Sequence, residues 1–169
     1  MSSSERPGPD PGIAISVRAE LGELPWRVAR DLVDHVLADA DRQGLCVAVA
    51  LVDRWGRQLA FQRQPGTVIA SSAVAIGKAL VACTFDAPTH VLVETISRRD
   101  QEELGRANPG LVFAGGGFPL RAGGLLAGAI GVSGGSVQQD AELALAALER
   151  AGLDFDFGAQ SDRKEDGDG

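Results

Sequence analysis

The sequence predicts an α/β fold of the α+β kind, with an antiparallel sheet of about five strands and helices on both faces. Two observations carry this prediction: two segments, 46–63 and 110–134, have the pattern of β-hairpins, and hairpins pair their strands antiparallel. Helical patterns lie before, between and after these hairpins, so both faces of the sheet can be covered. At 169 residues the chain is long enough to bury one good core without disulfides or metal.

The first half of the chain is predicted to form a helix, a hairpin and a second helix. Residues 24–43 place apolar side chains on one face at helical spacing, and Gly44 is a natural stop. Residues 46–53 form a near-continuous β-run typical of a central strand, and 57–63 alternates like its hairpin partner. Residues 69–85 form a helix whose stripe of small side chains indicates close packing by another element.

The second half continues with a short helix, a glycine-rich hairpin and a last helix. A capping box predicts a helical turn over 97–104. Residues 110–124 are expected to form a strand, a turn and a second strand, and 125–134 a buried strand weakened by glycine. Ser136 opens a second capping box, which predicts a helix over 137–151.

Composition divides the chain into a single domain, 13–157, between two disordered ends. Residues 1–12 are rich in proline, serine and glycine, which predicts a disordered arm, and 158–169 read as a disordered acidic tail. The net charge is −7, and residues 154–169 carry six acids against two bases, so residues 13–153 are nearly neutral. Without a basic stripe, no nucleic-acid binding is expected.

No membrane span or secretory signal is expected either. The apolar run from Val68 to Phe85 is broken by Lys78, and the first twelve residues have no apolar core. The two cysteines, Cys46 and Cys83, are far apart in the sequence and do not make a disulfide scaffold. We therefore expect a cytoplasmic protein.

Two charged residues in otherwise apolar segments are candidates for chemistry. Lys78 is interpreted first as a lysine whose ammonium group reaches solvent from a mostly buried helix. Its functional alternatives are a bound anion or an amine with a lowered pKa in a dry pocket. Asp53 ends the central strand, where turn chemistry is the simpler interpretation and proton transfer the functional one.

The segment Gly131–Gly135 matches the G-x-S-x-G elbow of serine hydrolases between a strand and a helix. That fold needs a histidine after the serine, but His35 and His90 both precede it, so a hydrolase is disfavoured. The amides from Ser133 to Ser136 open a helix, where they either bind an anion or form a plain turn; the sequence leaves both open.

The two histidines are the candidate ligands for a metal or haem. His35 falls away from the apolar face of its helix, which favours an exposed or interface position, and binding there requires a ligand at the surface or between subunits. His90 lies near a helix start, where a structural role is the simpler interpretation. Two isolated histidines cannot form a closed zinc site alone.

Three sequence blocks together resemble the GlcG/HbpS family over roughly residues 25–150. They are VAVALVDRWGRQLAFQR (47–63), AVAIGKA (73–79) and GGGFPLRAGGLLAGAIGVSGGSVQQD (115–140). The resemblance implies a profilin-like fold and homo-oligomers, and some members of the family bind haem. The positions that match the family motifs are Asp53, Lys78, Gly116, Gly117, Pro119, Ser133, Gly134, Gly135 and Asp140.

The chain departs from the family pattern at two places. The segment after the second strand, Arg63–Thr67, lacks the acid and the methionine that are usual in the family. His35 lies about one turn earlier than the histidine that the family can carry near the end of its first helix. Both departures leave room for a ligand other than haem.

Three functions follow, all centred on a pocket between the Lys78 helix and the turns 115–119 and 133–135. The first is a small-molecule-binding protein that handles haem. Its axial ligand would be His35 or His90, or come from outside the chain, and its propionates would be held by amides or Lys78. The second is an enzyme on a small organic acid, with Lys78 or Asp53 transferring a proton and helix-end amides holding a carboxylate. The third is a non-catalytic oligomeric subunit.

Overall fold

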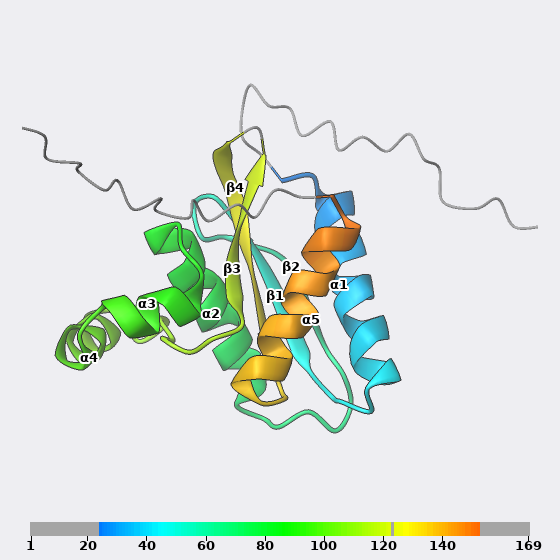
Figure 1. Cartoon of the computed structure of the whole chain (residues 1–169), viewed down its shortest axis with the longest axis horizontal. Helices are drawn as coiled ribbons and strands as arrows, with labels where there is room; N and C mark the ends of the chain where they lie inside the picture. The colour runs from blue at the N-terminus through cyan, green and yellow to red at the C-terminus, as the bar shows by residue number, and fades with distance from the viewer. Residues whose placement is uncertain (1–23, 123, 153–169) are drawn as a thin grey trace, which may run out of the picture.

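The computed structural model describes residues 24–122 and 124–152, and within these ranges it has five helices and four strands (Figure 1). In chain order these are α1 (Trp26–Arg42), β1 (Ala48–Asp53), β2 (Gln58–Arg63), α2 (Ser71–Phe85), α3 (Thr89–Thr95), α4 (Arg98–Ala107), β3 (Gly117–Ala122), β4 (Leu125–Ser133) and α5 (Val137–Arg150). The termini assigned to disordered ends, 1–12 and 158–169, lie outside the described residues.

The strands form one antiparallel sheet in the order β2-β1-β4-β3. Ala48 at the start of β1 pairs with Arg63 of β2 on one side and with Ser133 of β4 on the other. Asp53 at the end of β1 pairs with Gly128 of β4. The two strands in the middle of the sheet, β1 and β4, are therefore paired on both sides, whereas β2 and β3 are the edges of this described sheet.

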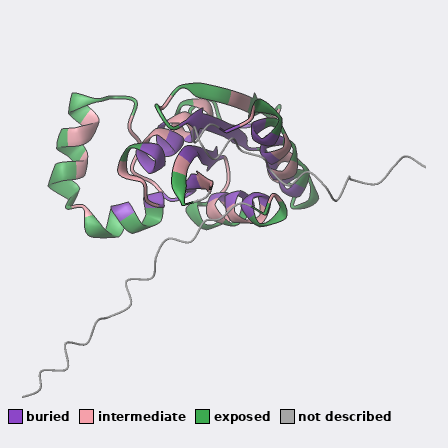
Figure 2. Cartoon of the chain, turned by 90° about the horizontal axis from the view of Figure 1, so that it is seen from above, coloured by how far each residue is buried: buried purple, intermediate pink, exposed green. Residues whose placement is uncertain are grey.

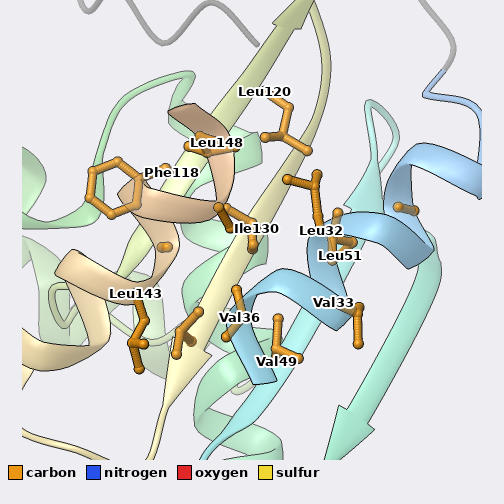
Figure 3. Packing of buried hydrophobic residues seen from close by; sticks show 14 of the residues in the cluster. Leu32, Val33, Val36, Val49, Leu51, Phe118, Leu120, Ile130, Leu143 and Leu148 are labelled. Atoms are coloured by element: carbon orange, nitrogen blue, oxygen red, sulfur yellow. The ribbon is translucent and has the colours of Figure 1, made fainter. Parts of the chain in front are cut away.

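Helices cover both faces of the sheet, as predicted. α1 and α5 pack together on one face and α2 covers the other (Figure 1). Because side chains alternate along a strand, Val49 and Leu51 of β1 face the α1/α5 layer and join the main hydrophobic core (Figure 3). Their neighbours Ala48 and Ala50 face α2, where small side chains let helix and sheet approach closely.

The antiparallel sheet is as predicted, and the described residues give it four strands, one fewer than the five or so expected. The first strand expected within 110–124 does not form: residues 110–116 run along α2 instead. The amide of Val112 donates to the Gly77 carbonyl oxygen at 3.4 Å, and a Cβ on Gly77 would overlap Val112 Cγ2. The loop therefore packs against the small residues of α2 instead of pairing with a strand.

The capping predictions are confirmed. Ser97 accepts a hydrogen bond from the Asp100 amide at the start of α4, and Ser136 forms a complete capping box with Gln139 at the start of α5. α4 has no buried residue in the described structure, and Figure 2 shows the α3–α4 pair projecting from the body with mostly exposed residues.

Candidate functional site

Lys78 is buried in an ion pair. Its side chain is only 2% exposed, and Nζ donates to Asp140 Oδ2 at 2.8 Å and to the Val132 carbonyl oxygen at 2.9 Å. The interpretation of Lys78 as a lysine that reaches solvent is therefore wrong. The ammonium group points into the protein because a carboxylate on α5 and a carbonyl on β4 replace its water.

The glycine turn before β3 lies directly over this pair. A Cβ on Gly116 would be 2.9 Å from Asp140 Cβ and 3.1 Å from Lys78 Nζ, and its φ is +109°, so only glycine fits easily. A Cβ on Gly117 would be 2.5 Å from the Lys78 carbonyl oxygen, and the Gly117 amide donates to the buried Thr89 Oγ1 at 2.9 Å. The turn thus connects β3 to α2 and α3.

The turn before α5 completes the cluster. The Gly135 amide donates to Asp140 Oδ1 at 2.9 Å, and the Ser136 amide donates to Gln139 Oε1 at 2.9 Å. Two of the amides considered for an external anion therefore already have acceptors within the chain. Asp140 therefore binds Lys78 through Oδ2 and the turn before α5 through Oδ1.

The three segments predicted to line one pocket do meet at one end of the sheet. Gly134, which matches a position of the family motif, is also closely packed, since a Cβ on it would overlap the Cys46 carbonyl oxygen. Lys78 and Asp140 fill the centre of this cluster. The sequence singled out both residues but did not predict their contact. They are 62 positions apart, and no local sequence pattern indicates that they pair.

Asp53 lies at the opposite end of β1 and does not join this cluster. Its Oδ1 accepts from the amides of Trp55 and Arg57, each at 2.9 Å, and its Oδ2 accepts from Arg57 Nε at 2.7 Å. Burial would by itself raise the pKa of Asp53, but these hydrogen bonds outweigh burial and hold the pKa below its ordinary value of 3.8. The carboxylate organises the β1–β2 turn, as turn chemistry predicts.

Because the pKa of Asp53 is lowered, the free energy of unfolding depends on pH in the acid range. Because the folded protein holds Asp53 ionised more strongly than the unfolded chain does, its contribution is present above pH 3.8 and is lost as the pH falls through the lowered pKa. We expect urea unfolding followed from about pH 5 to about pH 2.5 to show a smaller acid-induced loss in Asp53→Asn than in the native chain. Identical pH profiles for the two proteins would contradict this role.

The histidines lie apart from the Lys78 cluster and from each other. His35 is half-buried on the flank of α1 that faces away from Val33 and Leu37, and its Nδ1 is buried with no hydrogen-bond partner among the described residues. Within 24–122 and 124–152, no three His, Cys, Asp or Glu side chains come together to hold a metal ion. A metal bound by His35 would therefore need ligands from another source.

His90 is exposed at the start of α3, beside the glycine turn. Its ring lies 5.8 Å from the ring of Phe118, centroid to centroid. A Cβ on Gly115 would be 3.6 Å from His90 Cβ and 2.6 Å from Val137 Cγ1, so these two side chains flank Gly115. His90 and the exposed Val137 thus share a surface next to the glycine turn, although the sequence placed them 47 positions apart.

Comparison with known proteins identifies the family. The model of the haem degrading protein HbpS-like family matches residues 24–149. The chain belongs to this HbpS-like family. Among the described residues of this HbpS-like chain, no helix has the length and hydropathy needed to cross a membrane.

Two curated relatives support the assignment. This HbpS-like chain is 30% identical over 138 residues to an uncharacterized 15.0 kDa protein from the dhaT-dhaS intergenic region of Citrobacter freundii, covering 77% of the chain and 93% of that protein. It is 36% identical over 133 residues to the corrinoid adenosyltransferase PduO of the same organism, covering 74% of the chain. The match spans only 38% of PduO.

Solved structures share the fold of this HbpS-like chain. The PduOC:heme complex superposes with a TM-score of 0.74 at 27% identity, over 79% of this chain and 98% of that one. The crystal structure of HbpS gives 0.68 at 31% identity, over 76% and 89%. The Klebsiella pneumoniae protein ORFY gives 0.71 at 30%, over 76% and 90%.

Proposed function

We propose that this protein binds haem. The observation that carries the proposal is the likeness to the PduOC:heme complex over nearly the whole length of that structure, together with membership of the HbpS-like family. A cytoplasmic, homo-oligomeric state remains part of this proposal.

His90 is the residue that would best hold the haem iron. Its imidazole is accessible on the surface, and its neighbours include the apolar side chains of Val93, one helical turn along α3, and Val137, which are 40% and 56% exposed. An accessible nitrogen ligand beside exposed apolar side chains suits a large apolar ring. His35 is the second candidate because its buried Nδ1 lacks a partner, but its half-buried place on α1 leaves less room for a planar ligand.

When bound, haem would supply an iron centre for ligand binding and redox chemistry. His90 would hold that iron through a ring nitrogen, and the exposed valines would exclude water from the ring. Lys78 is less suited to hold a propionate, since its side chain is only 2% exposed and two of its three N–H donors already bind Asp140 and Val132. The same occupancy weakens the alternative of an acid–base enzyme that uses Lys78.

Titration of hemin into the full-length protein, followed at the Soret band, tests the proposal. We expect saturable, near-stoichiometric binding with a shifted band, and an affinity at least about tenfold lower in His90→Ala. Glu149→Ala, at an exposed position near the end of α5, is the matched control and should bind like the native protein.

The titration tests haem binding and the choice of the iron-binding histidine separately. A featureless, non-saturating response in the native protein would exclude haem as the ligand. Normal binding in His90→Ala with loss in His35→Ala would keep haem binding but assign the iron-holding residue to α1.

A further inference from the structure

A groove lies between α1 and β2, which pack beside each other (Figure 1). Its volume is about 400 Å³, which is within the range of pockets that bind small molecules. Trp26, Val33 and Leu37 line it from one side of α1, and Leu59 and Ala60 line it from β2. This apolar part of the lining suits the body of a small ligand.

Two charged side chains line the same groove. Arg30 and Asp34 are four residues apart on α1, so they lie one helical turn apart on the same side of the helix. Both residues are exposed, which places their charges at the rim of the groove. The groove thus combines one positive and one negative group with an apolar wall.

The positive group lies at the Trp26 end of the groove. The guanidinium carbon of Arg30 is 5.5 Å from the centre of the Trp26 ring. The ion pair of Arg30 with Asp31 is long, at 3.7 Å, and the two side chains are 61% and 49% exposed. Because solvent screens such a pair, it holds the guanidinium group only weakly. Arg30 can therefore bind the carboxylate of a ligand at little cost.

The negative group has no cation of its own among the described residues. Asp34 forms no ion pair there, and Arg30, one turn away, contacts Asp31 instead. A ligand that carries only a carboxylate is repelled by Asp34, and a ligand that carries only an ammonium group is repelled by Arg30. Both charges are satisfied only by a ligand that carries a carboxylate and an ammonium group together.

We propose that this groove binds a free α-amino acid with a large apolar side chain. Its carboxylate pairs with Arg30, its ammonium group pairs with Asp34, and its side chain packs against the apolar wall. One carbon of the ligand carries both charged groups, and the Cβ atoms of residues four apart on a helix are only about 5–6 Å from each other, so both pairs can form at once. The groove is separate from the surface around His90, so this proposal does not depend on haem binding.

Three compounds of similar shape test the two charges. L-phenylalanine carries both charges, hydrocinnamate lacks the ammonium group and phenethylamine lacks the carboxylate. Each is titrated into the full-length Trp55→Phe variant, in which the emission of Trp26 reports on the groove. We expect saturable binding of L-phenylalanine, with an affinity at least about tenfold higher than that of either analogue. A response that does not saturate, or equal affinities for the three compounds, would overturn the proposal.

Neutral variants then assign each contact. Arg30→Gln should abolish the preference for L-phenylalanine over phenethylamine, and Asp34→Asn should abolish the preference over hydrocinnamate. Arg27→Gln is the matched control, because Arg27 contacts the Trp26 ring at 5.3 Å but does not line the groove, and it should keep both preferences. Equal urea midpoints verify that the variants are folded. Preferences that survive in Arg30→Gln and Asp34→Asn would contradict the assignment.

Discussion

Replacing Lys78 by methionine is expected to lower the free energy of unfolding by about 3–5 kcal/mol, because it leaves a buried carboxylate without its partner. Asp140 is 2% exposed, and Lys78 is the cation bonded to it. Methionine keeps the approximate length of the side chain, so the loss reports the charge rather than a cavity. Urea unfolding followed by circular dichroism measures it.

The matched controls separate burial from charge. Arg99 pairs with Glu103 at 3.1 Å on the surface of α4, and Arg99→Met should cost less than about 0.5 kcal/mol because solvent screens that pair. The double variant Lys78→Met with Asp140→Leu removes both buried charges, so it should be more stable than Lys78→Met alone. A Lys78→Met loss no larger than that of Arg99→Met would show that the buried pair does not stabilise the fold.

The sequence predicted where the helices and strands lie better than it predicted the number of strands. Hydrophobic periodicity located both central strands and three long helices within a few residues, because burial of one face leaves a local pattern. It failed at 110–116, where an apolar, glycine-containing run resembles a strand but packs on Gly77 of α2. Whether such a run pairs or packs depends on a distant helix and not on the run itself.

The sequence predicted which residues belong to the candidate site, but not which of them contact one another. The family motifs located Gly116, Ser133 and Lys78, and the structure brings their segments together. The interpretation of Lys78 failed because a lone charge in an apolar helix has the same local pattern whether it reaches water or a buried acid. The surface shared by His90 and Val137 has no local signal, since it forms only because α3 and α5 each place a side chain beside Gly115.

Gly131→Ala is expected to lower the free energy of unfolding by about 3 kcal/mol through overpacking. Gly131 lies in β4 opposite α2, and a Cβ there would overlap the Ala75 carbonyl oxygen and lie 2.7 Å from the Ala79 amide nitrogen. Both neighbours are helix backbone, which cannot rotate away as a side chain would. The whole of α2 must therefore move outward from the sheet.

The same substitution at Gly105 should act in the opposite direction. Gly105 lies within α4 with nothing within 4 Å of its added Cβ, so Gly105→Ala should stabilise that helix by about 0.5–1 kcal/mol. Thermal and urea unfolding of the two variants compare close approach with helix propensity in one chain. Equal stabilities would mean that α2 tolerates displacement. A selective loss in Gly131→Ala would mean that contact between helix and sheet backbones requires glycine in this part of the family motif.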